Sequence, residues 1–280
     1  MAEYRYRIVN VFAEERFAGN PLAVFEDARG MDDTTMQALA LQFNLSETTF
    51  LLPAESATAR VRIFTPANEM PFAGHPTLGS AYVVRALSQC GNTLSLEMTA
   101  GVIPVSAMGD VFTLQANAAK IRPARLTRDA LASMLGLAPA DLGERPLWVS
   151  TGSEQLLVPL ISPDAVARCQ PEPRLAQRHA NEAGMVKIYV WAETGDEQVV
   201  ARFFFSKHRG AIEEDPGTGS ACANLGGWML AAKKPLPLTR LIYQGDRVGR
   251  PSRLRLSVDE TGTIFVAGRV IELGHGTVSI

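Results

Sequence analysis

The feature that most constrains this chain is an internal repeat at half its length. Val61–Ala81 and Ala201–Ala221 align without a gap at an offset of 140 in a chain of 280 residues. The six matching pairs are Arg62/Arg202, Phe64/Phe204, Pro76/Pro216, Gly79/Gly219, Ser80/Ser220 and Ala81/Ala221. In each copy a strand-like run leads through a loop to a helix that we expect to begin at the proline. A period this long does not suit a solenoid, so the repeat predicts two related domains with a boundary near Ala116–Pro123.

Strand-like apolar runs outnumber helical ones along the rest of the chain. We expect strands at Arg7–Phe12, Leu22–Phe25, Thr49–Leu52, Ala59–Phe64, Thr93–Met98, Gln155–Leu160, Met185–Trp191, Val199–Phe205, Arg253–Val258 and Thr263–Val270. We expect helices at Thr34–Phe43, Pro76–Leu87, Leu126–Leu135 and Pro216–Ala232. Because strands predominate and the long helices lie far apart, the pattern predicts an α+β fold.

Composition and charge exclude several classes of function. The net charge of -2 does not favour binding to nucleic acid or to a membrane surface. No run of about 18 apolar residues appears, and the first residues carry charges where a signal peptide needs an apolar stretch. Cys90, Cys169 and Cys222 lack any CxxC spacing, so we expect neither a disulfide framework nor a thiolate zinc site. These observations predict a cytoplasmic protein.

Two residues that can carry protons occupy matching places in the repeat. His75 precedes the proline of the first copy and Asp215 precedes that of the second. A helix N-terminus presents unpaired N–H groups that bind anions, and Gly74, Gly217 and Gly219 allow a ligand to approach the backbone. Two such helix starts facing each other could hold a carboxylate and stabilise negative charge beside it. Read singly, Asp215 also fits a plain helix cap and His75 a structural histidine.

Other motifs carry weaker signals. By spacing alone, Glu47 fits a solvated loop glutamate between a helix and a strand. The chain lacks a dinucleotide fingerprint, a Walker A loop and a G-x-S-x-G elbow. His208 lies near Glu213 and Glu214, but no comparable ligand set supports a metal site, so we expect no metal.

Several short motifs in order along nearly the whole chain resemble the PhzF-like proteins, a family named for the phenazine-biosynthesis isomerase and related to diaminopimelate epimerase. The motifs that carry the resemblance are Phe17–Val24 (FAGNPLAV), Asn44–Thr48 (NLSET), Phe72–Thr77 (FAGHPT), Glu214–Ala221 (EDPGTGSA), Gln244–Asp246 (QGD) and Gly249–Ser252 (GRPS).

The resemblance implies two pseudo-symmetric domains, each a curved mixed sheet wrapped around a central helix, with the active site between them. It also implies a homodimer that needs no cofactor. We expect residues 1–118 to form the first domain, completed by a strand near residues 270–280. Residues 119–269 then form the second.

The resemblance also assigns roles to residues. It implies that Glu47 is the principal acid/base, which reverses the interpretation from spacing, and that Asp215 and His75 assist. The positions expected to bind substrate are Asn20, Ser46, Gly74, Gly217, Thr218, Gly219 and Ser220. Amino-acid racemases related to this family use two cysteines at the places of His75 and Asp215. Cys222 stands at neither place, so a two-cysteine epimerase activity is not expected.

Together these observations predict a cofactor-independent isomerase that moves a proton on a small carboxylate-bearing metabolite. Two alternatives stay open: a non-catalytic protein that binds a carboxylate metabolite, and a hydrolase with Ser220 as nucleophile. Neither the substrate nor a role for the Gln244–Ser252 loop follows from the sequence.

Overall fold

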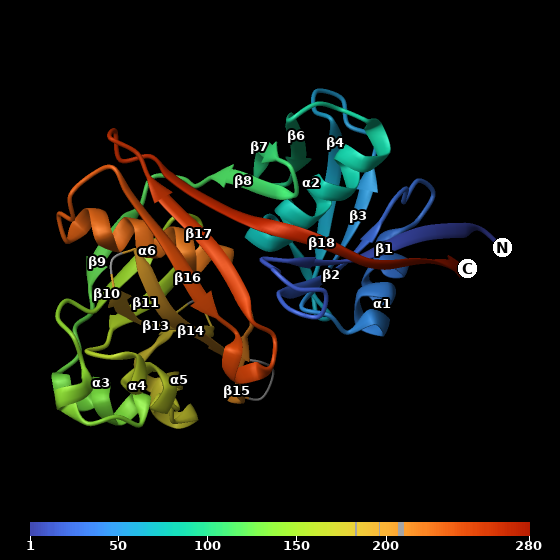
Figure 1. Cartoon of the computed structure of the whole chain (residues 1–280). Helices are drawn as coiled ribbons and strands as arrows, with labels where there is room; N and C mark the ends of the chain where they lie inside the picture. The colour runs from blue at the N-terminus through green and yellow to red at the C-terminus, as the bar shows by residue number, and fades with distance from the viewer. Residues whose placement is uncertain (183, 196, 207–209) are drawn as a thin grey trace. The chain divides into compact units, whose positions relative to one another are not determined.

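The computed structural model of the chain describes every residue except 183, 196 and 207–209. Its contacts divide the chain into two compact units, both shown in Figure 1. Unit 1 comprises Met1–Gln115 and Ala267–Ile280, and unit 2 comprises Ala116–Val266. Both divisions lie a few residues before the expected ones.

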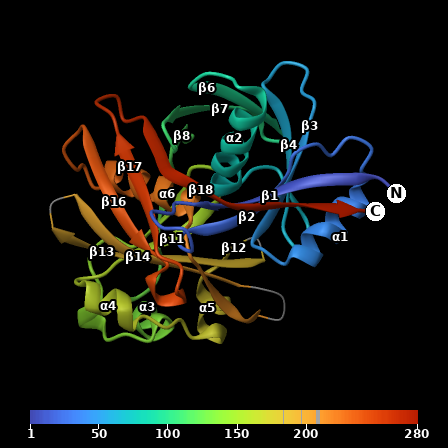
Figure 2. The ribbon, with the colours of Figure 1, turned by 45° about the vertical axis from the view of Figure 1, so that its right-hand side comes forward.

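Unit 1 is built from strands that surround one long helix. Its elements are β1 (Glu3–Val11), β2 (Asn20–Phe25), α1 (Asp33–Phe43), β3 (Glu47–Leu52), β4 (Ala59–Phe64), β5 (Glu69–Met70), α2 (Gly74–Ser88), β6 (Thr93–Met98), β7 (Gly101–Met108) and β8 (Val111–Gln115). The pairs β1–β2, β3–β4, β6–β7 and β7–β8 are antiparallel, whereas β2–β3 and β4–β6 are parallel. The final strand β18 (Ile264–Ser279) pairs antiparallel with β1, and these red and blue strands run side by side in Figures 1 and 2.

The sheet of unit 1 curves around α2. The helix packs against β1, β2, β3, β4, β6 and β8. Small residues allow this close approach, since a Cβ added at Gly79 would lie 2.6 Å from Leu22 Cδ2 and 3.0 Å from Val11 Cγ2. The outer face of the sheet packs on α1 through an aromatic cluster that includes Phe25, where Phe25 and Phe50 stack with ring centroids 4.9 Å apart. Both faces of the sheet therefore contribute to the core.

Unit 2 has the same plan. Its elements are β9 (Lys120–Pro123), α3 (Arg128–Leu135), η1 (Pro139–Asp141), β10 (Leu147–Ser150), β11 (Glu154–Pro159), α4 (Pro163–Arg168), α5 (Pro173–His179), β12 (Asn181–Glu182), β13 (Met185–Gly195), β14 (Gln198–Ser206), β15 (Ile212–Asp215), α6 (Gly219–Ala231), β16 (Leu238–Gln244), η3 (Asp246–Val248) and β17 (Ser252–Val258). The buried helix α6 packs against β9, β10, β11 and β17. On the other side of the sheet, helices α3, α4 and α5 cover a second apolar cluster.

The order of strand pairing confirms the internal repeat. In unit 2 the pairs β10–β11, β13–β14 and β16–β17 are antiparallel, whereas β11–β13 and β14–β16 are parallel. A short strand before the central helix pairs with β4 in unit 1 and with β14 in unit 2. The matched arginines have the same role, because Arg62 pairs with Glu69 and Arg202 with Glu214, each at 2.7 Å. Each guanidinium also lies over the ring of the phenylalanine two residues further on.

Local sequence explains where two of the other helices begin. The Asp32 carboxylate accepts the Thr35 N–H at the start of α1, and the Thr127 hydroxyl caps α3 in the same way. Gly136 ends α3 with a positive φ of 65°. In the part of the chain that the structure describes, no helix is both long and apolar enough to cross a membrane.

Candidate active-site residues

In unit 1 the predicted residues gather at the start of α2. The helix begins at Gly74, so the expectation that Pro76 is its first residue is wrong. His75 therefore lies inside the first turn, and the residue is 6% exposed. Thr77 strengthens this turn, because its hydroxyl donates to the carbonyl of Ala73 at 2.7 Å. The imidazole is fixed by the helix rather than placed on a loop before it.

Glu47 and His75 lie side by side. Glu47 is the first residue of β3, and its Oε2 is 3.3 Å from His75 Nε2. On the other side of the ring, Asn20 Nδ2 lies 3.4 Å from His75 Nδ1. The close contact between Glu47 Oε2 and His75 Nε2 does not have the geometry of a hydrogen bond. The side chain of Glu47 is 15% exposed and can still reach a ligand.

Burial keeps the His75 imidazole neutral. It lowers the pKa of His75 from 6.5 to about 3, because the charged ring would lose its hydration. A hydrogen bond to the backbone of Pro21 in the protonated form acts in the opposite direction and is the weaker influence. At neutral pH His75 is therefore a neutral ring beside the Glu47 side chain and not a cation.

The other predicted positions of unit 1 differ in exposure. Asn20 is fully buried at the start of β2, where it contacts His75. Gly74 is half-buried as the first residue of α2. Ser46 is exposed in the bend before β3. Asn20 and Gly74 thus adjoin the Glu47–His75 pair directly, and Ser46 adjoins it through the chain.

In unit 2 the predicted residues form a turn between β15 and α6. Helix α6 begins at Gly219, so the expectation that Pro216 opens it is also wrong. Asp215 is the last residue of β15 and pairs with Phe203, so it is not in a helical turn as His75 is. The two residues match in sequence, but their backbones differ.

Two side chains hold this turn away from the helix. The Thr218 hydroxyl donates to the Asp215 carboxylate. Gln244, the last residue of β16, donates its Nε2 to the Asp215 carbonyl and to Thr218 Oγ1, both at 2.9 Å. Since Thr218 Oγ1 accepts from Gln244, its proton is left for Asp215. Gly217, Thr218 and Gly219 are buried, and Asp215 is partly exposed.

The remaining predicted residue, Ser220, lies in the first turn of α6. Its Oγ accepts a hydrogen bond of 2.8 Å from Gln155 Nε2. An amide cannot take a proton from a serine, so this partner does not make Ser220 a nucleophile. This contact gives the hydrolase alternative no support.

Comparison with known proteins places these residues in a family. The sequence model of the phenazine biosynthesis-like proteins (PhzC-PhzF) matches residues 9–276. The chain belongs to this family. An uncharacterized isomerase of Pasteurella multocida is 43% identical over 285 residues, which cover all of this chain and 96% of that protein. The trans-2,3-dihydro-3-hydroxyanthranilate isomerase of Pseudomonas aeruginosa is 32% identical and covers 92% of each chain. With full-length relatives named isomerases, the chain is a member of an isomerase family.

Solved structures show the same fold. The crystal structure of a PhzF-family phenazine biosynthesis protein of Bacillus anthracis superposes with a TM-score of 0.88 at 25% identity, covering all of both chains. A hydroxyproline epimerase from Agrobacterium vitis covers 99% of this chain and 93% of its own with a TM-score of 0.66 at 14% identity. That second likeness shows only the fold. Together the two likenesses confirm the predicted α+β class.

Two of the chain's three thiols are buried. Burial raises the pKa of Cys169 to about 12 and raises that of Cys222 further, so these thiols resist ionisation. Among the residues that the structure describes, no three His, Cys, Asp or Glu side chains gather as metal ligands. His208, considered above with Glu213 and Glu214, falls outside the described residues.

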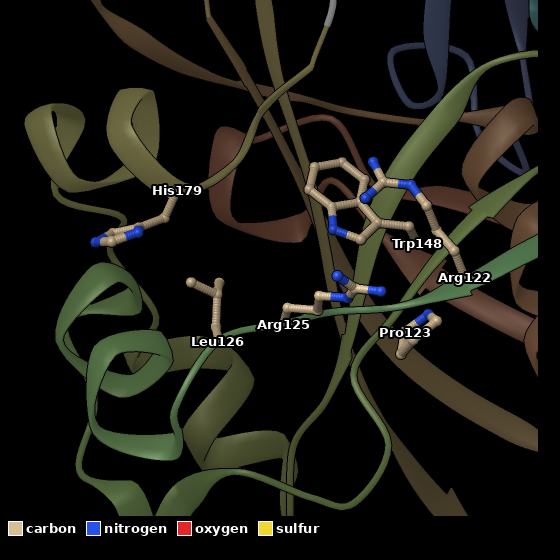
Figure 3. A pocket seen from close by; sticks show the side chains of 6 residues that line it. All are labelled: Arg122, Pro123, Arg125, Leu126, Trp148 and His179. Carbon is tan, nitrogen blue, oxygen red and sulfur yellow. The ribbon is translucent and has the colours of Figure 1, made fainter.

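A surface pocket of unit 2 is separate from the predicted residues. It has a volume of about 360 Å³, and its lining residues are Arg122, Pro123, Arg125, Leu126, Trp148 and His179 (Figure 3). The Arg122 guanidinium lies 4.5 Å from the Trp148 ring and also pairs with Glu154 at 2.8 Å. The charge of the Arg122 guanidinium is therefore already paired within the protein. None of the predicted catalytic or binding residues lines this pocket.

Proposed function

We propose that this chain is a cofactor-independent isomerase that moves a proton on a small carboxylate-bearing metabolite. Glu47 removes and returns the proton, and His75 and Asp215 assist. The observation that carries this proposal is the contact of 3.3 Å between Glu47 Oε2 and the neutral imidazole of His75. Membership of an isomerase family supports the same reaction class.

The Glu47–His75 pair suits a proton transfer that repeats. A neutral imidazole does not neutralise the carboxylate beside it, so Glu47 keeps the capacity to accept a proton. A buried imidazolium would instead form an ion pair and make Glu47 a weaker base. The low pKa of His75 thus favours a Glu47 carboxylate that can act as a base over one held in an ion pair with His75.

The start of α6 supports the second part of the proposal. Removal of a proton from carbon leaves negative charge on the substrate, and preorganised N–H groups stabilise such charge. The buried Gly217–Gly219 segment supplies backbone close to Asp215, and α6 is a helix of 13 residues. We propose that this segment contacts the substrate where the charge develops and that Asp215 delivers or receives the second proton.

The proposal is tested with the compound in the name of the Pseudomonas aeruginosa relative. Trans-2,3-dihydro-3-hydroxyanthranilate would be incubated with the chain in deuterated water and followed by NMR and mass spectrometry. We expect an isomer that carries one solvent deuterium on the receiving carbon when the proton removed exchanges with water. Saturable binding without any change in the compound would instead favour the non-catalytic binding protein.

A further inference from the structure

Five residues of unit 2 form one hydrogen-bonded relay that ends at Ser220. The backbone N–H and the hydroxyl of Thr151 both donate to Asn224 Oδ1, each at 2.8 Å. Asn224 Nδ2 donates to the Ser153 carbonyl and to Gln155 Oε1, each at 2.9 Å. Gln155 Nε2 then donates to Ser220 Oγ at 2.8 Å. Asn224 and Gln155 are 0% and 1% exposed, so water does not compete for these bonds.

The direction of every bond in the relay follows from the first one. The backbone N–H of Thr151 can only donate, so the oxygen of Asn224 faces it and the amide nitrogen faces Gln155. That nitrogen also only donates, so Gln155 turns its oxygen to Asn224 and its nitrogen to Ser220. The Ser220 oxygen is therefore an acceptor, and its own proton points away from the relay. Because Ser220 is only partly buried, this proton is available to a ligand.

A lysine belongs to the same cluster. Lys187 Nζ donates to Ser153 Oγ at 2.9 Å, and the carbonyl of that serine accepts from Asn224. Burial lowers the pKa of Lys187, since the ammonium has lost part of its hydration. Within the described part of the chain, Lys187 has no carboxylate partner at ion-pair distance. A partly dehydrated cation of this kind is stabilised by an anionic ligand.

Strand register places Lys187 beside Gln155. Leu156 and Ile188 pair in parallel register and both belong to the apolar cluster under helices α3 to α5. The residues before them, Gln155 and Lys187, are therefore neighbours on the opposite face, toward α6. Glu213, the acidic residue in the same row, lies two strands beyond Lys187, which is about 10 Å at the usual strand spacing.

We propose that Lys187 is the counter-ion of the substrate carboxylate, beside the hydroxyl of Ser220, which the family resemblance already assigns to substrate binding. Gln155 and Asn224 are positioning residues that fix the direction of the Ser220 hydroxyl. The inference rests on the proposed function and adds the group that recognises the carboxylate. One ammonium balances the single charge of a carboxylate, whereas a phosphate monoester carries about two charges at pH 7.

The test uses anthranilate, a stable aromatic carboxylate, and its neutral analogue 2-aminobenzamide. Isothermal titration should show saturable binding of anthranilate to the wild-type chain and binding of the amide at least about tenfold weaker. Lys187→Gln should weaken anthranilate binding by about 10- to 100-fold, the range for a hydrogen bond to a charged group. Lys120→Gln, an exposed lysine of the same unit, is the matched control and should bind as wild type.

A second variant tests whether the direction of the Ser220 hydroxyl matters for binding when Lys187 and Ser220 are both still present. In Gln155→Glu the new carboxylate accepts the Ser220 proton and lies beside Lys187, so anthranilate should bind about 10- to 100-fold more weakly although both ligand-binding groups remain. Gln198→Glu adds the same charge at an exposed position of β14 and serves as its control. With a substrate that the chain turns over, Lys187→Gln and Gln155→Glu should each raise KM more than they lower kcat.

Three results would overturn the subsite: no saturable anthranilate binding by wild type, equal affinity for the amide, or wild-type affinity in both Lys187→Gln and Gln155→Glu. These failures are distinct from failure of the proposed function. A Glu47→Gln chain that still turns over substrate would remove the acid/base role and leave anthranilate binding in place. Conversely, loss of the subsite leaves a Glu47-dependent exchange measurable at high substrate concentration.

Discussion

Gly245 is the residue of unit 2 whose substitution the structure predicts most sharply. It lies between β16 and η3 with φ +82°. A Cβ added there would overlap the carbonyl oxygens of Arg250 and Pro216, which are backbone atoms that a rotamer change cannot move. Pro216 follows Asp215, so Gly245→Ala should displace the turn that carries this carboxylate. This contact suggests a structural role for the Gln244–Ser252 loop, which packs against the turn that carries Asp215.

The magnitude follows from two contributions. An alanine in the left-handed region costs about 1–2 kcal/mol, and forcing extra volume into packed structure costs about 1–3 kcal/mol more. Gly245→Ala should therefore lower the free energy of unfolding by about 2–5 kcal/mol. Gly249 in the same loop has φ +69° and no atom within 4 Å of an added Cβ. Gly249→Ala should show only the conformational cost of about 1–2 kcal/mol.

Urea unfolding of the wild type and both variants, followed by circular dichroism, measures the two free-energy differences. The expected difference between the variants, about 1–3 kcal/mol, is the cost of the overlap alone. Activity supplies a second measure, because only Gly245→Ala should move Asp215 and lower kcat/KM. Equal destabilisation by the two substitutions would refute the claim that the loop is pressed against the Asp215 turn.

Three further predictions concern unit 1 and assembly. Because burial lowers the pKa of His75 from 6.5 to about 3, the unfolded chain binds a proton between these values and the folded chain does not. Stability should thus fall as the pH is lowered from 6.5 toward 3, by up to about 1.4 kcal/mol per unit. His75→Asn should flatten this slope in urea unfolding at several pH values, and an unaltered slope would contradict the low pKa. Gly79→Ala should destabilise the chain by about 1–3 kcal/mol, because the added methyl group would contact Leu22. Gly91→Ala is its control: the added methyl group meets nothing within 4 Å, so stability should change by less than about 0.5 kcal/mol. Equal effects of the two substitutions in thermal unfolding would contradict the packing of α2. From the family resemblance we propose a homodimer, so light scattering should give about twice the chain mass of 30.3 kDa, and the mass of one chain would exclude it.

The sequence predicted the two-unit plan because the repeat preserves structural residues. Arg62 and Arg202 each clamp the short strand that precedes the central helix, and this role requires the same residue at the same register. The strand runs were also predictable, since several alternate in hydrophobicity as half-buried strands do; in β17 Leu254, Leu256 and Val258 are buried and the residues between them are more exposed. At these arginines and strands, the preference of the local sequence and the final fold are the same.

The helix starts could not be predicted from the prolines. Proline is favoured at the first position of helices in proteins, but at Pro216 hydrogen bonds from Gln244 and Thr218 oppose this preference. Gln244, on β16, donates a hydrogen bond to the Asp215 carbonyl, and the Thr218 hydroxyl donates one to the Asp215 carboxylate. Those bonds keep the segment extended until Gly219. The error therefore arises from tertiary hydrogen bonds that no local pattern records.

The polar contacts of unit 2 were missed for a related reason. Gln155, Lys187, Asn224 and Gln244 come from four different elements and match no short motif. Gln244 was noticed only as part of a family motif, without a role. A buried glutamine in a strand with apolar neighbours, as at Gln155, is the one signal that could have been followed, because buried amides require partners.

The most direct test of the account is the Glu47→Gln variant, which keeps the shape of the side chain and removes its capacity to take a proton. With a compound that the wild type isomerises in deuterated water, the variant should lose at least about 10²-fold in kcat. It should still bind anthranilate as wild type does, because the proposed carboxylate subsite lies in unit 2. Deuterium incorporation by Glu47→Gln at the wild-type rate would show that another group moves the proton.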